Sequence, residues 1–174
     1  MRRYMSSILV VILLLTAGQS VLAMARAHVP VTVTIPQMII LELDANELIF
    51  AETDFDYILG SASRIKTGIM ATKIEAVTAT VSGNVPYTLL ISAPEEFLYG
   101  QRGGLVHISQ LRWRHSPAYD GGVWEEITLE RRPVQSGRAG VAEVAFDFRL
   151  TVFWENPAQI YAGAILLTVV ADSL

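Results

Sequence analysis

Apolar and polar residues alternate along most of the chain beyond residue 27, and this alternation constrains the fold more than any other feature. The clearest run covers residues 143–154. One face of that run carries Val144, Phe146, Phe148, Leu150, Val152 and Trp154, and the other carries Glu143, Ala145, Asp147, Arg149, Thr151 and Phe153. A period of two residues is that of a strand with one buried face, and no stretch of this region keeps the 3.6-residue period of a helix. The sequence therefore predicts an all-β protein.

Turn residues divide this region into strands at intervals of about ten residues. Residues 29–35 alternate in the same way, and Pro30 and Pro36 indicate that this strand lies at a sheet edge or is bracketed by them. Short runs follow at 38–43 and 47–51. About seven to nine such strands are typical of an antiparallel immunoglobulin-like β-sandwich, which is the fold that we expect.

The middle of the chain contains an irregular segment and an expected hairpin. Residues 52–69 predict a long loop or a short crossover, because they are rich in Asp, Gly and Ser. Residues 71–82 and 86–93 both alternate, and Gly83-Asn84 separates them. A hairpin is the simplest arrangement of two such strands around a short turn.

The second half of the chain predicts four further strands, of which residues 143–154 form one. In residues 105–114 the alternation slips between Ile108 and Leu111, which indicates a β-bulge. Another strand is expected at 123–129. The run at 161–171 is apolar on both faces and therefore predicts a buried or covered strand.

The N-terminal segment has the order of parts found in a secretory signal. Arg2 and Arg3 precede an unbroken apolar run at residues 8–15, and small residues follow at Ala23, Ala25 and Ala27. The run is about half the length of roughly 20 residues that a membrane-spanning helix needs, so cleavage is favoured over a permanent anchor. We expect a signal peptide at 1–27 and a single domain at 28–174, exported to the periplasm, cell surface or medium.

The cleavage position stays open between two A-x-A frames. Cleavage after Ala25 leaves Arg26 at the new N-terminus, whereas cleavage after Ala27 leaves His28 there. The difference matters because an N-terminal histidine can offer both its amino group and its imidazole to a metal ion.

Composition excludes several classes of site. The chain has no cysteine, which rules out disulfides, thiolate metal sites and attachment of lipid to a cysteine. Its net charge is −4, and loss of the three leader arginines makes the remainder about −7. Such a domain is a poor partner for nucleic acid or an anionic membrane. Arg112 and Arg114 alternate on one expected strand, so we predict that they lie on a solvated face.

Three short segments resemble parts of exported bacterial β-sandwiches, namely the pilus-subunit-like, spore-coat-U-like and WxL-like domains. They are VTVTIP at 31–36, SGNVPYTL at 82–89 and YAGAILLTV at 161–169. The sequence lacks the cysteine pairs usual in the first two groups and the motif that names the third. The resemblance implies a role in structural assembly, envelope attachment or adhesion.

Histidines carry the one specific chemical hypothesis. If His28 begins the exported chain, its amino group and ring can chelate Cu(II), and His107 or His115 would complete the ligand set. This predicts, as the alternative function, a periplasmic module that binds a small ligand or copper. Otherwise we expect no cofactor.

Aromatic residues around one loop are the candidates for an interaction site. Trp113 and Trp124 flank the sequence SPAYDGG, which contains Tyr119, and exposed rings there would stack on a sugar or a peptide. Trp113 shares its face with Leu111 and is predicted to lie in the core. For Trp124 the two interpretations remain balanced.

Motifs for catalysis are absent from the sequence. There is no cysteine nucleophile, no G-x-S-x-G turn and no glycine-rich phosphate loop. We therefore expect a non-enzymatic envelope or surface protein that engages protein partners by strand-edge pairing, self-assembly included.

Overall fold

The structure is a computed structural model that describes residues 30–59, 66–116 and 122–172. The chain divides into two units, residues 1–35 and 36–174. Within the first unit, the described residues 30–35 belong to no helix or strand. The second unit contains twelve strands among its described residues, all paired antiparallel in three sheets, so the all-β prediction is confirmed. No helix in the described ranges is long and apolar enough to cross a membrane.

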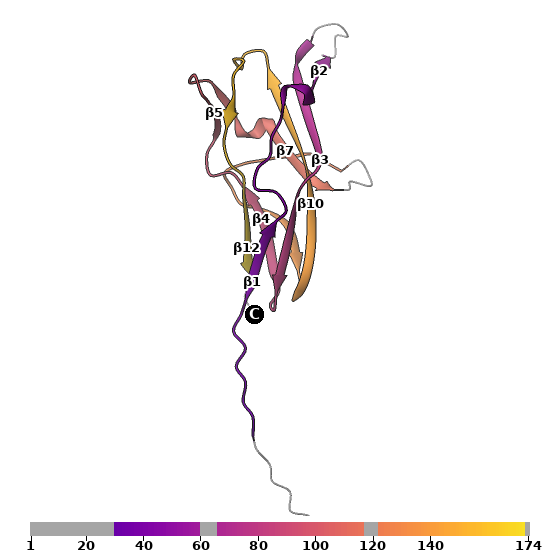
Figure 1. Cartoon of the computed structure of the whole chain (residues 1–174), viewed down its shortest axis with the longest axis vertical. Helices are drawn as coiled ribbons and strands as arrows, with labels where there is room; N and C mark the ends of the chain where they lie inside the picture. Colours follow the sequence, from indigo (N-terminus) through magenta and orange to yellow (C-terminus); the bar gives the residue numbers. More distant parts are fainter. Residues whose placement is uncertain (1–29, 60–65, 117–121, 173–174) are drawn as a thin grey trace, which may run out of the picture. The chain divides into compact units, whose positions relative to one another are not determined.

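Six strands form the largest sheet, here called the large sheet. Five of them have the order β1 (Ile39–Leu43), β3 (Lys66–Gly83), β10 (Gly140–Phe153), β7 (Leu111–Ser116) and β8 (Glu125–Glu126). The sixth, β2 (Phe55–Leu59), pairs with β3. β1 and β2 pair with different halves of β3, because that strand is 18 residues long. The pairing of β3 with β10 is the most extensive in the protein and spans almost the whole of both strands (Figure 1).

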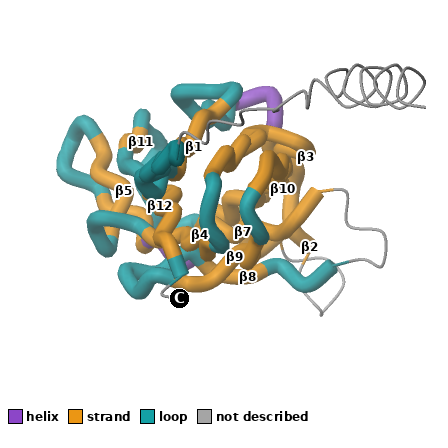
Figure 2. Tube along the Cα trace, turned by 90° about the horizontal axis from the view of Figure 1, so that it is seen from below, coloured by secondary structure: helices purple, strands orange, loops and turns teal. Residues whose placement is uncertain are grey.

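Two three-stranded sheets complete the fold. The small sheet has the order β12 (Leu166–Ala171), β4 (Tyr87–Ser92) and β9 (Arg132–Gly137), and the end sheet has the order β11 (Tyr161–Ala162), β5 (Phe97–Gly100) and β6 (Leu105–His107). Two single-turn 3-10 helices, η1 (Glu52–Asp54) and η2 (Ile108–Gln110), connect strands. Figure 2 looks along the strands and shows β4 and β12 beside the layer that contains β3 and β10.

The core lies where the large sheet faces the small sheet. The small sheet contributes Tyr87, Leu89 and Ile91, and the large sheet contributes alternate residues of β3, β7 and β10: Val77, Ala79, Val81, Leu111, Trp113, Val144, Phe146 and Phe148. Each large apolar side chain buried in this way stabilises the fold by about 1.5–3 kcal/mol. Packing of these side chains replaces the disulfides that this chain lacks.

The expected hairpin of residues 71–82 and 86–93 is wrong, because β3 and β4 belong to different sheets. Their apolar faces meet across the core, which buries both, and the turn carries the chain from one layer to the other. Asn84 holds this crossing in place. Its Oδ1 accepts a hydrogen bond from the Met38 amide at 2.8 Å, and its Nδ2 donates to the Pro36 carbonyl at 2.7 Å.

Two irregular features differ from their predictions. The segment 52–69 contains η1 and β2, because Phe55 to Leu59 fold back on β3. The slip at residues 108–110 is η2 rather than a β-bulge, and it moves the chain from the end sheet into the large sheet. Residues 47–51 form no strand, and the strand expected at 123–129 is limited to the two residues of β8.

The C-terminal run is not a covered strand, in contrast to the prediction. It splits into β11 and β12, and β12 pairs only with β4 among the described strands. Leu167 and Val169 pack on the core, but Leu166 and Val170 on the other face are 46% and 43% exposed. That face is therefore partly open to solvent, and the alternation of residues does not reveal this.

A β-bulge interrupts β3 at Glu75. Val77 pairs with Phe146 and Lys73 with Phe148, so three residues of β3 lie opposite Asp147 alone. Glu75 takes φ = 49°, and its amide donates to Asp147 Oδ1 at 2.9 Å. The bulge therefore directs a backbone donor toward a side chain of the neighbouring strand.

Candidate functional site

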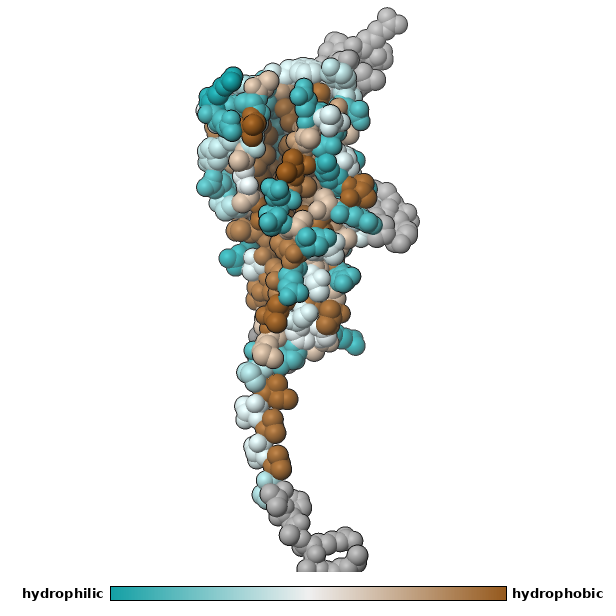
Figure 3. Space-filling model, in the orientation of Figure 1, coloured by the Kyte–Doolittle hydropathy of each residue, from teal (hydrophilic) through white to brown (hydrophobic). Residues whose placement is uncertain are grey.

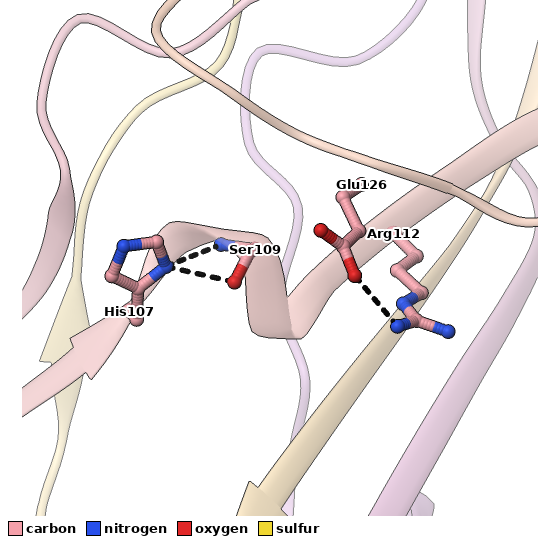
Figure 4. Close-up of polar contacts among 4 residues, drawn as sticks. All are labelled: His107, Ser109, Arg112 and Glu126. Carbon is pink, nitrogen blue, oxygen red and sulfur yellow. Dashed lines mark hydrogen bonds and ion pairs between the residues drawn. The ribbon is translucent and has the colours of Figure 1, made fainter.

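The predicted copper ligands have separate environments in the structure. His28 lies outside the described residues. His107 caps η2: its Nδ1 accepts from the Ser109 amide at 3.2 Å and lies 2.8 Å from the Ser109 hydroxyl (Figure 4). Its Nε2 lies 3.4 Å from a carboxylate oxygen of Glu96. A metal at Nδ1 would have to displace this cap.

His115 belongs to the large sheet, whereas His107 ends a strand of the end sheet. The Nε2 atom of His115 lies 3.1 Å from the Val134 carbonyl oxygen, and its ring lies next to Trp113 and Phe146. The described ranges contain no group of three histidine, aspartate or glutamate side chains that could hold a metal ion. The copper site stays a prediction that depends on His28.

The two candidate tryptophans have different surroundings. Trp113 is 2% exposed in the core, as predicted. Trp124 is half-buried, and two guanidinium groups cover it: the Cζ atoms of Arg149 and Arg114 lie 4.0 Å and 4.4 Å from its ring centroid. Tyr119, the other predicted interaction residue, lies outside the described residues.

These contacts belong to a group of charged residues that we call the arginine cluster, consisting of Arg112, Arg114, Arg149, Glu126 and Asp147. Its members lie on the outer face of the large sheet, since their neighbours Trp113 and Phe148 point into the core. The strand register places Arg149 opposite Arg112 and Asp147 opposite Arg114. Arg112 and Glu126 form an exposed ion pair at 2.7 Å. The cluster joins β7, β8 and β10.

Asp147 is the anchor of the cluster, because its side chain is only 1% exposed on a face that the sequence predicts to be wet. It accepts from Arg114 Nε at 2.8 Å and from the Glu75 amide at 2.9 Å. Burial by itself would raise the pKa of Asp147, but the nearby Ser116 hydroxyl, these two hydrogen bonds and the charge of Arg114 outweigh it and hold the pKa below its ordinary value. The carboxylate is therefore ionised in the folded chain.

Arg149 differs from the other two arginines because no carboxylate of the described residues pairs with it. Its Nε donates to Thr72 Oγ1 at 3.3 Å. Its pKa is lowered by burial and, in addition, by the charges of Arg114 and Arg112. Three guanidinium groups thus share two carboxylates within the arginine cluster, and Arg149 is the one without a carboxylate partner there.

A cavity of about 420 Å³ opens beside Arg112 on the same sheet. Its lining combines one ion pair, two hydroxyl groups, an amide and two apolar side chains: Arg112, Glu126, Ser109, Thr151, Gln110, Ile58 and Phe153. The amide oxygen of Gln110 is buried and has no hydrogen-bond partner among the described atoms. Figure 4 shows the Arg112–Glu126 ion pair on one side of η2 and His107 on the other.

Two further features present apolar groups to solvent. The first is β12, whose edge away from β4 has no strand partner among the described residues. The second is the extended segment 30–35, in which Val31, Val33 and Ile35 are 81%, 74% and 73% exposed. Figure 3 shows hydrophobic atoms along one side of this segment and paler ones along the other.

Sequence reasoning identified Arg112 and Arg114 but predicted only a solvated face for them. The outward direction of both side chains, and of Arg149, follows from the alternation and is confirmed. What it missed is that Trp124 packs on the arginines and that Asp147 is buried beneath. The available signal was a set of four charged residues at outward positions of two strands. The sequence does not show how they pair, because their pairing depends on the register between β7 and β10.

Comparisons with known proteins leave the chain without a family. No family model matches it, and no curated protein matches it. Among solved structures, it is similar to a family 123 glycoside hydrolase from Clostridium perfringens, whose study concerned glycolipid glycan hydrolysis. The two share 12% identity at a TM-score of 0.37, over 78% of this chain and 25% of that one. This chain therefore spans about a quarter of that enzyme, and a likeness this weak carries no argument.

Proposed function

We propose that this protein is a non-enzymatic, exported envelope or surface protein with an immunoglobulin-like sandwich, and that it assembles with further copies of itself by strand-edge pairing. The observation that carries the proposal is the edge of β12, which has no strand partner among the described residues. Edge strands expose backbone N–H and C=O groups that can pair with another chain, and natural sheets normally block them with charges or proline.

The two edges of the small sheet differ in this protection. On the β9 edge, Arg132 and Pro133 supply a charge and a residue that cannot donate to a ladder. On the other edge, β12 reads LLTVVA and contains neither a charge nor a proline. Leu166 and Val170 are about half exposed there. The difference favours β12 as an edge that is kept available for a partner.

The segment 30–35 has the chemistry of a suitable partner strand. It is extended, and every second residue is apolar and exposed, so it can pair along an edge and bury one face. β1, which continues the chain after it, lies beside β12 but pairs only with β3 (Figure 1). Segment 30–35 of one copy entering beside β12 of another would bury apolar groups of both.

The experiment compares oligomeric states of the processed chain by size-exclusion chromatography with light scattering, from 1 to 100 µM. We expect concentration-dependent association, and Val33→Asp should weaken it by about tenfold or more, because a valine buried at an interface is replaced by a charge. Thr34→Asp is the matched control: it adds the same charge to the opposite face of the same segment and should leave association nearly intact. A synthetic peptide of residues 28–36 should compete.

Two results would overturn the proposal. One is a wild-type chain that stays monomeric over the whole concentration range. The other is equal loss of association in Val33→Asp and Thr34→Asp, which would show that the apolar face of the segment is not used. Circular dichroism of both variants confirms that the sheets are unchanged.

A further inference from the structure

We propose that Asn84 keeps segment 30–35 away from the β12 edge of its own chain and so directs it to the β12 edge of a second copy. The hydrogen bonds of Asn84 to residues 36 and 38 are here called the Asn84 latch. This inference rests on the proposed function and concerns how its partner is selected: pairing within one chain needs a reversal of the backbone, and the latch prevents it.

The ends of β1 and β12 show why a reversal is needed. Ile39, the first residue of β1, pairs with Gly83, and Ala171, the last residue of β12, pairs with Tyr87. β1 therefore begins at the end of the fold where β12 stops, because only the short β3–β4 crossing separates Gly83 from Tyr87. For segment 30–35 to run alongside β12 of the same chain, the backbone would have to turn back within residues 36–38.

The Asn84 latch holds these three residues straight. The Met38 amide donates to Asn84 Oδ1 at 2.8 Å, Asn84 Nδ2 donates to the Pro36 carbonyl at 2.7 Å, and the Asn84 amide donates to the Met38 carbonyl at 3.1 Å. The side-chain amide thus bonds the C=O of one residue and the N–H of the residue two further on. A peptide group of a parallel strand pairs in the same way, and this pattern requires an extended backbone between the two bonded residues.

The sequence at the latch would otherwise permit a turn. Proline is favoured at the first central position of the common turn types, so Pro36-Gln37 is suited to reverse the chain. Residues 30–38 nevertheless contain no turn in the structure. A turn there would redirect the Pro36 carbonyl and break its bond to Asn84. The latch is therefore the feature that opposes the reversal.

Release of the latch would place two copies of the same segment in competition for β12. A segment tethered by a short connection has an effective concentration in the millimolar range, far above that of a second chain in micromolar solution. Once the reversal is possible, pairing within the chain would therefore exclude pairing between chains. The latch makes association possible by removing this competitor.

The first test measures association of the processed chain by size-exclusion chromatography with light scattering. Asn84→Ala should weaken association by about tenfold or more, because its own segment then occupies β12. Asn46→Ala, at an exposed asparagine in the bend after β1, is the matched control and should associate like wild type. An insertion of about eight Gly and Ser residues between Ile35 and Pro36 keeps the latch but gives the segment slack, so it should also yield monomers.

The second test identifies which chain supplies the segment. The chain has no cysteine, so Val33→Cys and Thr168→Cys together provide one thiol on the segment and one on β12. Cysteine is a small apolar side chain and preserves the character of position 33. With a short bismaleimide, we expect products of two or more chains on a denaturing gel. In the Asn84→Ala background, the crosslink should form within single chains.

The outcomes separate this inference from the proposed function. A wild-type chain that stays monomeric overturns the proposed assembly, whatever Asn84→Ala does. If the wild type associates, two results overturn the latch. One is association of Asn84→Ala equal to that of wild type. The other is loss of association in Asn84→Ala without crosslinks inside single chains, which would show that the asparagine supports the interface and does not restrain the segment. Circular dichroism of each variant verifies that the sheets are intact.

Discussion

At the scale of single residues, Asp147 is the side chain on which the outer face of the large sheet depends. It is nearly completely buried, it accepts from Arg114 and from the Glu75 amide, and it is ionised. Asp147→Asn keeps the shape but leaves the Arg114 charge without its counter-ion. We expect a loss of about 2–4 kcal/mol in the free energy of unfolding, measured by urea denaturation. Glu143→Gln, on the same face of the same strand and exposed, should change it by less than about 0.5 kcal/mol.

The pH dependence of that loss identifies its cause. Because the pKa of Asp147 lies below its ordinary value of 3.8, the unfolded chain takes up a proton at a higher pH than the folded chain does. The stabilisation by this carboxylate is therefore complete above the unfolded pKa and disappears as the pH falls through the folded pKa. The difference between wild type and Asp147→Asn should be constant from about pH 7 to 5 and shrink below about pH 4. A difference that does not change with pH would contradict an ionic origin.

At the scale of elements, the bulge on β3 makes Glu75 the only residue other than glycine with a positive φ among the described residues. Glu75 has φ = 49°, a conformation that costs any residue with a Cβ about 1 kcal/mol or more and is worst for β-branched ones. Glu75→Gly should therefore be more stable than Glu75→Val by about 1–2 kcal/mol in urea denaturation. At Glu143, in regular extended backbone, the order should reverse, because valine favours strands and glycine weakens them. The same order at both positions would refute the strained bulge.

The β3–β4 crossing is the other element that decides the architecture. The sequence SGNVP has the composition of a hairpin turn, and the strands on both sides alternate as hairpin strands do. In the structure Asn84 bonds instead to the backbone of residues 36 and 38, and the chain passes to the other sheet. A hairpin and a crossing between layers have the same local pattern, because both need a turn between two strands with one buried face each.

At the scale of the whole molecule, the fully buried apolar side chains of the described residues lie within residues 71–148, and the partly buried ones packed against them begin at Ile39. A chain that begins at Pro36 should therefore keep the free energy of unfolding of the processed chain to within about 0.5 kcal/mol, since removal of segments without buried contacts costs little. Under the proposed function, the same shortened chain should lose concentration-dependent association. Urea denaturation and light scattering on one preparation measure both. A loss of more than about 2 kcal/mol would show that the segment stabilises the fold itself.

The sequence by itself determined the all-β class, a strand at 143–154 that the structure places at 140–153, and the inward or outward direction of most of its side chains, because alternation with a period of two depends only on local backbone geometry. It also predicted that Trp113 is buried and that no disulfide contributes. Only the tertiary structure decided which strands pair, that the C-terminal strand lies at an edge, and that Asp147 is buried under arginines on an outward face. These features depend on register and on packing between segments far apart in the chain, and no local pattern of residues specifies either.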